Sequence, residues 1–269
     1  MCSSDLESGA GQYELTLAPA DPVTAADRAI TSRAIVRDLA AAHGLRAVFS
    51  PLVRPDAVGN GTHIHLSLWD RAGHPVTLDP ATLEPSVALG RFAAGVLAHA
   101  GALVGWTAPS VISSIRLRPH RWSAGAAFLG RQNREALLRL CPLPTLGGEP
   151  PLGAANVEYR AADATANPWL ALAALILAGT DGLVRELPAP PVIDGEVDDL
   201  DAAERARLGI ADLPADLPAA LAAIEADPAA RGWFAADLTA THLSVRRSEL
   251  AALADATPEE ACERYGRVI

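Results

Sequence analysis

The order of hydrophobic and polar residues predicts strands and helices in alternation. Residues 12–17 alternate apolar and polar side chains with the period of a strand. Asp21 and Pro22 are typical of a helix N-cap and first helical position, and Gly44 is typical of a helix end, so residues 22–43 are predicted to be helical. Residues 46–52 are predicted to form another strand, followed by a turn rich in Pro, Asp and Gly.

The second half of the chain has stronger helical signals. A turn-rich segment, residues 79–84, precedes a predicted amphipathic helix over residues 87–104. Residues 106–157 have no regular period and contain several Pro and Gly residues. Asn167 and Pro168 then begin the strongest predicted helix, residues 168–184. Residues 187–191 (Leu-Pro-Ala-Pro-Pro) predict a linker or a segment packed over the surface, and the acidic, alanine-rich remainder predicts a helical cap without a chemical motif.

Composition narrows the function classes. The chain has 269 residues, of which 50% are hydrophobic, and no apolar run approaches the ~18 residues of a membrane span, so it is expected to be globular and not membrane-bound. Its net charge of −10 argues against nucleic acid as a partner. Three widely spaced cysteines, Cys2, Cys141 and Cys262, favour a reducing cytoplasm.

The sequence contains no lysine, so all of its Lys/Arg cations are arginine. A P-loop lysine and a Schiff-base lysine are therefore excluded. Any anionic ligand must be held by arginine, by backbone N–H groups or by a metal.

The segment of residues 59–69 (Gly-Asn-Gly-Thr-His-Ile-His-Leu-Ser-Leu-Trp) carries the most informative pattern. Its alternating run predicts a strand, and the period of two places His63 and His65 on the same face. Two neighbouring imidazoles suit a metal or a phosphate, although each histidine could instead be hydrogen-bonded in an ordinary strand.

Carboxylates and arginines elsewhere could complete such a site. Glu7 and Glu14 flank a glycine-containing loop that can bring both carboxylates to one hard cation, although a solvated loop is the simpler interpretation. Glu158 and Arg160 share a face of a predicted strand, as a surface ion pair or as a metal ligand beside an anion-binding arginine. A local excess of arginine in an apolar setting favours phosphate or carboxylate binding over a solvated loop. Its members are Arg116, Arg118, Arg121, Arg131, Arg134 and Arg139.

Taken together and in order, these segments resemble the catalytic domain of the glutamine synthetase family. The resemblance covers residues 7–183 and depends on six motifs. Residues 7–14 are similar to E-x-x-P-G-Q-x-E, 61–67 to G-M-H-x-H-x-S, 113–119 to S-Y-x-R-L-x-P, 133–139 to N-R-x-A-x-x-R, 158–160 to E-x-R and 163–170 to D-x-x-A-N-P-Y-L.

The resemblance implies a role for each matching residue. Divalent metals would be bound by Glu7, Glu14, His63 and Glu158. The nucleotide would be contacted by His65, Ser67, Arg134 and Arg139. Substrate glutamate would be held by Gly59, Arg116 and Arg160, while Arg116 and Arg139 would act in catalysis, Arg139 in the manner of an arginine finger.

The activity implied is that of a cytoplasmic, ATP-dependent ligase with Mg²⁺ or Mn²⁺, which activates glutamate as γ-glutamyl phosphate and joins it to ammonia. Donor and acceptor are both anions, so metals and arginines must neutralise their approach. The fold implied is α+β, a curved and mainly antiparallel sheet backed by helices, with a helical C-terminal segment. Family members form homo-oligomers of stacked rings with active sites between subunits.

The match also implies domain boundaries. Residues 1–6 match nothing in the family and are expected to be a non-native leader. Residues 7–269 are expected to be a partial catalytic domain, with a motif-bearing core at 7–187 and a linker and helical part at 188–269. The family's N-terminal β-grasp domain and an early strand with two more metal glutamates are absent from the match, so we expect the chain alone to be inactive and to assemble poorly.

Several positions depart from the family pattern. Ala10 replaces a proline, Asn156 replaces an arginine that contacts nucleotide, Val58 replaces an asparagine, and Trp122 replaces the glutamate that deprotonates ammonium. The last two changes lie where glutamate and ammonium are handled and favour a bulkier amine. The alternative function is therefore a γ-glutamyl-amine ligase that uses a polyamine, ethanolamine or an aromatic amine.

Two other classes of protein remain as alternatives. A non-catalytic, ligand-binding relative would not need all of His63, Glu158, Arg116, Arg134 and Arg139. A dimetal hydrolase would account for the histidines and glutamates but not for the arginines.

Overall fold

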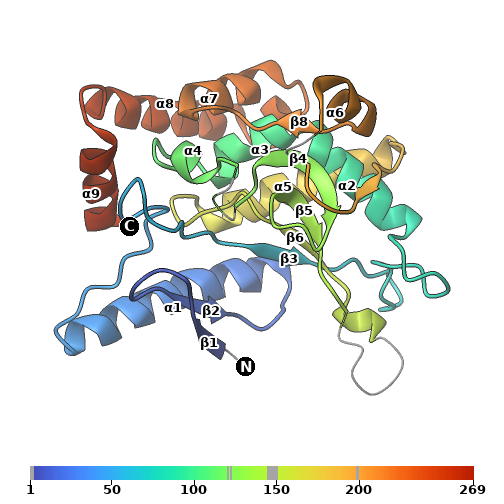
Figure 1. Ribbon diagram of the computed structural model, residues 1–269, viewed down its shortest axis with the longest axis horizontal. Coiled ribbons are helices and arrows are strands. Elements are labelled where there is room, and N and C mark those ends of the chain that lie inside the picture. The colour runs from blue at the N-terminus through green and yellow to red at the C-terminus, as the bar shows by residue number, and fades with distance from the viewer. Residues whose placement is uncertain (1–2, 120, 122, 144–150, 198–199) are drawn as a thin grey trace.

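Two sheets and several layers of helices make up the described part of the chain (Figure 1). The computed structural model describes residues 3–119, 121, 123–143, 151–197 and 200–269. The strands are β1 (Ser3–Leu6), β2 (Tyr13–Thr16), β3 (Ile64–Leu66), β4 (Ala126–Arg131), β5 (Ala136–Leu140), β6 (Val157–Tyr159), β7 (Val192–Ile193) and β8 (Ala211–Asp212). The helices are α1 (Pro22–Ala42), α2 (Val87–Ala98), α3 (Ala100–Thr107), α4 (Ser113–Arg116), α5 (Pro168–Val184), α6 (Ala202–Leu208), α7 (Leu217–Ala226), α8 (Ala236–Ala252) and α9 (Pro258–Val268), with 3-10 turns η1 (Leu152–Ala154) and η2 (Ala230–Gly232).

The main sheet has the strand order β3-β6-β5-β4-β7, and β8 pairs with β4. β3 with β6, β6 with β5 and β4 with β8 are antiparallel, whereas β4 is parallel to β5 and β7. The sheet is thus mixed but mainly antiparallel, as predicted. β1 and β2 form a separate antiparallel hairpin, which lies with α1 beneath the main sheet in Figure 1.

The predicted helices at residues 22–43 and 168–184 are confirmed. The side chain of Asp21 accepts a hydrogen bond from the backbone N–H of Thr24, and Gly44 adopts φ = 70°, the left-handed conformation that ends a helix at low cost. At α5 the side chain of Asn167 accepts from two backbone N–H groups and Pro168 occupies the first turn. Local chemistry therefore determines where these helices begin and end.

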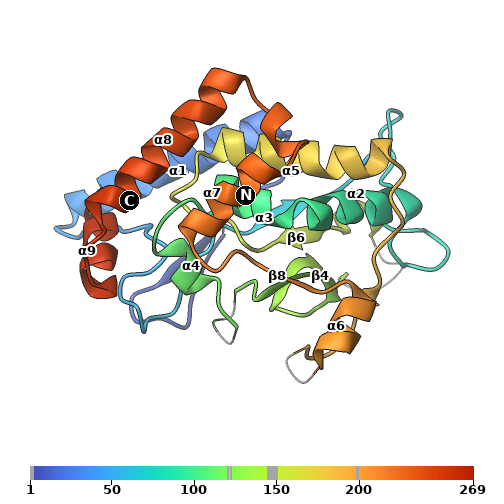
Figure 2. The ribbon, with the colours of Figure 1, turned by 90° about the horizontal axis from the view of Figure 1, so that it is seen from above.

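The helix predicted over residues 87–104 is two helices. α2 and α3 meet at His99 with a bend of 76°. α5 lies alongside the consecutive helices α2 and α3 in Figure 2, and the three helices supply much of the buried core, including Phe92, Leu103 and Leu175. No single helix among the described residues meets the length and apolarity of a membrane span; the bent pair α2–α3 meets both only when its two parts are combined.

Two other predictions of local structure are wrong. Residues 46–52 form no strand; instead the Phe49 N–H donates to the carbonyl of Ile269, and the Pro51 carbonyl accepts from the Asn60 N–H. Residues 106–157 are not irregular throughout, because they contain α4 and the two central strands β4 and β5. These strands are buried and lack an alternating polar face, so the period of two is missing from their sequence.

The C-terminal part packs against the rest of the chain. Ala189 contacts α2 at Gly90, and β7 joins the main sheet, so the segment 187–191 is packed over the surface rather than free. The remainder is helical as predicted, except for the short strands β7 and β8. The domain boundaries at residues 6 and 187 stay predictions.

Candidate active site

One face of the main sheet gathers the charged residues that the sequence predicts to be functional. The register pairs Glu158 on β6 with His65 on β3 and with Arg139 on β5. The flanking residues Val157 and Tyr159 are fully buried, and the Tyr159 hydroxyl is hydrogen-bonded to Thr107 of α3. Because successive side chains of a strand alternate between faces, Glu158 points away from the helices.

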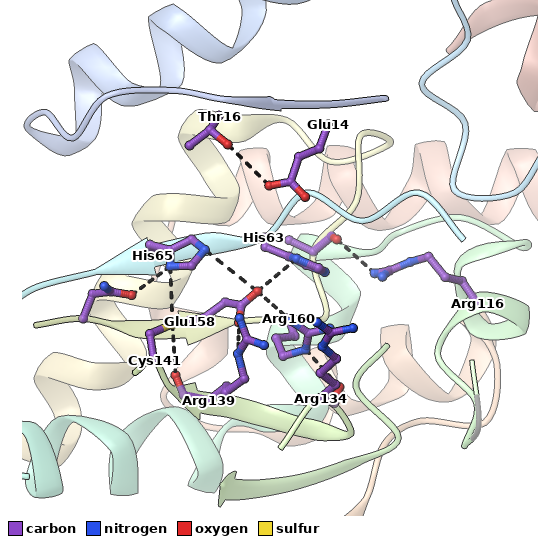
Figure 3. A network of polar contacts seen from close by, with 12 residues as sticks. Glu14, Thr16, His63, His65, Arg116, Arg134, Arg139, Cys141, Glu158 and Arg160 are labelled. Carbon is purple, nitrogen blue, oxygen red and sulfur yellow. Dashed lines mark hydrogen bonds and ion pairs between the residues drawn. The ribbon is translucent and has the colours of Figure 1, made fainter. Parts of the chain in front are cut away.

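Glu158 is the centre of this face (Figure 3). Its side chain is only 1% exposed, and its two oxygens contact His63 Nδ1 at 3.0 Å, Arg160 Nη1 at 2.7 Å and Arg139 Nε at 2.5 Å. Burial alone would raise the pKa of this carboxyl, but the hydrogen bond with His63 and the two arginines lower it to about 2. Glu158 is therefore an anion held in a positive environment.

His63 is a neutral imidazole in this setting. Burial lowers its pKa, and the nearby Arg160 and Arg116 lower it further, while the contact with Glu158 opposes the shift. Nδ1 contacts Glu158, so Nε2 is the nitrogen left for another ligand. Gly61 lies against this nitrogen, since a Cβ there would come within 2.7 Å of it. A neutral ring with one available nitrogen suits a divalent metal.

Glu7 and Glu14 form a pair of carboxylates on the small β1–β2 hairpin. Burial raises the pKa of Glu14, and the hydrogen bond and charge of Glu7 raise it further. Two adjacent carboxylates provide the oxygen ligands that a hard divalent ion prefers. Figure 3 shows Glu14 facing His63 and His65 across the site.

These predicted metal ligands occur two by two, Glu7 with Glu14 and His63 with Glu158. Over the described part of the chain, no group of three or more His, Cys, Asp or Glu side chains is placed to hold a metal. The donor types thus fit a divalent ion, but neither pair makes a complete site by itself, and the assignment of these four residues as ligands stays a prediction.

Gln12 joins the two loops of the site and was given no role by the sequence analysis. Its amide Nε2 donates to the Gly59 carbonyl at 3.0 Å and to the Asn60 side chain at 2.6 Å. Its Oε1 accepts from the Gly9 N–H. One side chain therefore fixes the glutamate loop against the loop of residues 59–61; its place in the motif of residues 7–14 was the available signal.

Arg116 lies directly behind the loop of residues 59–61. It is 1% exposed, and its Nη2 donates to the carbonyls of Ala161 and Ala162. A Cβ on Gly59 would lie 2.6 Å from Arg116 Cγ, so the absence of a side chain there allows the close approach.

The guanidinium of Arg116 has no carboxylate bonded to it among the described residues. Burial lowers its pKa, and Asp163 is the nearby charge that opposes this shift. The carboxylate of Asp163 instead accepts from the hydroxyls of Ser113 and Thr165. Arg116 Nε is also buried, and none of the described residues forms a hydrogen bond with it. The fold thus holds an incompletely paired cation beside the glycine loop.

The arginine cluster of the sequence is divided by the fold. Arg139 and Arg160 converge on Glu158, and the exposed Arg134 lies beside Arg160, whose Nε donates to the Arg134 carbonyl (Figure 3). Arg131 lies elsewhere, paired with Glu84 and Asp194. Arg121 donates to the carbonyls of Pro55 and Ala57. The expectation that the whole cluster lines one anion site is therefore wrong for Arg131 and Arg121.

His65 and Ser67 lie on the exposed part of the site face. The His65 side chain is 51% exposed, with Nε2 3.9 Å from Glu158 and Nδ1 2.8 Å from the side-chain oxygen Oδ1 of Asn156. Ser67 accepts a hydrogen bond from the exposed Trp69 indole. The structure adds little about the two positions predicted to select the amine. Val58 is 40% exposed, and Trp122 is outside the described residues.

Comparison with known proteins supports the family resemblance found in the sequence. The family profile described as glutamine synthetase, catalytic domain, matches residues 2–265. The chain is 39% identical over 243 residues to gamma-glutamylpolyamine synthetase of Streptomyces coelicolor, which covers 90% of this chain and 52% of the relative. It is 32% identical over 251 residues to glutamine synthetase of Methanocaldococcus jannaschii, covering 92% of this chain and 53% of the relative.

The fold agrees as well. A crystal structure of a glutamine synthase homologue superimposes with a TM-score of 0.87 and 41% identity, over 98% of this chain and 58% of that structure. The chain therefore spans about half the length of the relatives it matches.

Proposed function

Because the chain belongs to the glutamine synthetase catalytic-domain family, we propose that it carries the phosphoryl-transfer half of an ATP-dependent ligase site that joins glutamate to ammonia or an amine. The observation that carries this proposal is the convergence of His63, Arg139 and Arg160 on the buried Glu158. A site with this charge pattern can hold the oxygens of a transferring phosphoryl group between positive side chains.

Each residue has a distinct part in this proposal. Arg116 binds a carboxylate of glutamate, because it is a buried cation whose own carboxylate neighbour is already bonded elsewhere. Arg160 and the backbone of Gly59 position the same substrate. Arg139, Arg134, His65 and Ser67 contact the nucleotide, and Arg139 neutralises the acyl phosphate as it forms.

A divalent ion, Mg²⁺ or Mn²⁺, fits the donor atoms of the Glu7–Glu14 pair and of the His63–Glu158 pair. Glu7 and Glu14 would hold one ion, and His63 and Glu158 would contribute to a second. When bound, such ions neutralise phosphate charge and orient the nucleotide. The chain's own residues supply the remainder, namely the arginines that fix the two anions.

The proposal also concerns the amine that accepts the γ-glutamyl group. The relative with 39% identity is a gamma-glutamylpolyamine synthetase, whereas the glutamine synthetase of M. jannaschii is 32% identical. Val58 and Trp122 replace polar residues of the family motif. Both observations favour an amine larger than ammonia, such as a polyamine.

Nucleotide binding tests the site in the chain as it stands. Calorimetry with Mg²⁺ and a non-hydrolysable ATP analogue should show binding, and Arg139→Ala should weaken it at least tenfold, since a lost charge-assisted contact is worth about 1.5–3 kcal/mol. Arg131→Ala is the matched control, because Arg131 pairs with Glu84 and Asp194 off the site and should leave the affinity unchanged. Absence of nucleotide binding, or an equal loss in both variants, would reject the proposal.

The acceptor amine is identified by measuring turnover of the full-length protein with different amines. Glutamate-dependent phosphate release from ATP is measured with ammonium, ethanolamine, putrescine and spermidine. We expect a polyamine to give the highest kcat/KM. If only ammonium supported turnover, the activity would be that of a glutamine synthetase and the proposal of a larger amine would be refuted.

A further inference from the structure

We propose that Asn156 is a positioning residue for the nucleotide-binding site, and that it acts by holding the imidazole of His65 in one orientation and one tautomer. The inference rests on the proposed function for the role of His65. Asn156 occupies the position where the family motif has an arginine that contacts nucleotide directly, so the chain would replace a direct contact by an indirect one.

The sheet register brings the two side chains together. His65 on β3 is paired with Glu158 on β6, and Asn156 lies two residues before Glu158 on the same face. Diagonal neighbours across an antiparallel pair are within reach of side chains of this length. The resulting contact joins Asn156 Oδ1 to His65 Nδ1 at 2.8 Å.

The orientation of the Asn156 amide is determined by a second contact. Its Nδ2 donates to the carbonyl of Ala154 at 3.0 Å, in η1 just before β6. The reverse orientation would place the amide oxygen against the Ala154 carbonyl oxygen and the NH₂ group against His65. Because the amide oxygen faces the ring, His65 Nδ1 must carry a proton and donate.

This hydrogen bond matters because packing does not fix the ring. The His65 side chain is 51% exposed, so neighbouring side chains leave it room to rotate. The other contact at Nδ1 is the Cys141 sulfur, at 3.6 Å, which is a weak partner. Burial raises the pKa of the Cys141 thiol, so the thiol stays uncharged and does not compete as an anion.

With Nδ1 bound to Asn156, the opposite nitrogen is directed into the site. Nε2 lies 3.9 Å from Glu158 Oε1, on the same side as Arg139 (Figure 3). In this tautomer Nε2 carries a lone pair and accepts, so it would meet a hydroxyl group of the nucleotide and not an anionic phosphate oxygen. The anchoring of one imidazole nitrogen so that the other faces its ligand is a common use of histidine.

The tautomer of His65 can be measured without nucleotide. Imidazole ¹⁵N chemical shifts, recorded above the titration range of histidine and assigned with His65→Gln, should show His65 as the Nδ1–H tautomer. Asn156→Ala should abolish this preference, whereas Asn156→Asp should retain it, because a carboxylate oxygen also accepts from Nδ1–H. A wild-type Nε2–H tautomer, or an unchanged tautomer in Asn156→Ala, would overturn the proposal.

A double-mutant cycle links the tautomer to binding. Asn156→Ala should lower the affinity for the Mg²⁺–ATP analogue about tenfold, the effect of removing a partner that orients a ligand histidine. In the His65→Gln background the same change should have no further effect, because Asn156 acts through His65. An undiminished loss in that background would show that Asn156 acts directly and would refute the positioning role.

The failure of the proposed function would look different. If the wild-type chain bound no nucleotide, the proposed ligase site would be refuted while the tautomer measurement would still decide whether Asn156 holds His65. Thr257→Ala controls for lost stability, since it removes a cap at α9, far from the site in sequence, and should alter neither the tautomer nor the affinity.

Discussion

A buried histidine at the bend between α2 and α3 offers the sharpest test of how this fold is held together. His99 is 6% exposed, and both ring nitrogens contact carboxylates: Nδ1 lies 2.6 Å from Asp227 and Nε2 lies 3.0 Å from Asp181. Both carboxylates are hydrogen-bond acceptors, so a ring nitrogen that carries a proton donates to one of them. Asp181 is on α5 and Asp227 follows α7, so three elements meet at one side chain.

The perturbation is His99→Leu, which keeps much of the volume and removes both ring nitrogens. Each charge-assisted hydrogen bond contributes about 1.5–3 kcal/mol to the free energy of unfolding. The Asp227 and Asp181 side chains are 17% and 23% exposed, so water recovers part of this loss. The edge-on contact of His99 with Trp233, with ring centroids 5.6 Å apart, is changed as well. We expect a net loss of about 3 kcal/mol, because two carboxylates are left facing each other.

Chemical and thermal denaturation followed by circular dichroism measure this loss. At ~2–4 °C per kcal/mol for a chain of this size, the midpoint should fall by roughly 6–12 °C. His74→Leu is the matched control: His74 also contacts a carboxylate, Asp70 at 3.1 Å, but its side chain is 74% exposed. An exposed pair contributes only ~0–1 kcal/mol. We call the contacts of His99 with Asp181 and Asp227 the His99 clasp. If His99→Leu lowered the free energy of unfolding no more than His74→Leu, the His99 clasp would not stabilise the fold.

Three further predictions concern stability. Gly182→Ala should lower the free energy of unfolding by about 1–3 kcal/mol and the thermal midpoint with it, because its Cβ would lie 2.1 Å from the Arg91 carbonyl oxygen and would separate α2 from α5. Gly232→Ala is the control: no atom lies within 4 Å of its Cβ, so the midpoint should change little. Thr257→Ala removes the capping box of α9 and should cost about 1 kcal/mol in urea denaturation, and an unchanged urea midpoint would contradict this. The pKa of Glu158 is lowered from 4.5 to about 2, so its ionised form stabilises the fold above pH 4.5 and this contribution is lost between about pH 4.5 and 2. Unfolding midpoints of Glu158→Gln and wild type should therefore converge as the pH falls through that window, and parallel profiles would refute the assignment.

The family, the helix ends and the candidate residues could be predicted from the sequence, because each depends on neighbours within a few positions. Asp21 and Pro22 begin α1, and Asn167 and Pro168 begin α5, through contacts within three or four residues. The alternating run around His63 and His65 likewise places both imidazoles on one face, whatever the strand pairs with. These features needed no knowledge of the tertiary structure.

The tertiary structure alone decided which residues meet. β4 and β5 are buried and do not alternate polar with apolar residues, so no local pattern in the sequence predicted these strands. Arg131 and Arg139 belong to the same arginine-rich segment of the sequence, yet pairing across the sheet directs Arg139 to Glu158, whereas Arg131 lies beside Glu84. The partner of a charge is set by strand register and chain topology, which sum contacts between distant segments.

The same reason explains what the sequence left unassigned. The contact of Asn156 with His65 joins residues 91 positions apart, and the clasp of His99 joins residues 82 and 128 positions apart. The hydrophobic pattern even predicted a continuous helix through His99, since nothing local marks the 76° bend. By itself the sequence determined which chemistry is present and where its helices start; only the folded chain determined which charge pairs with which, because pairing energies depend on distance and burial in space.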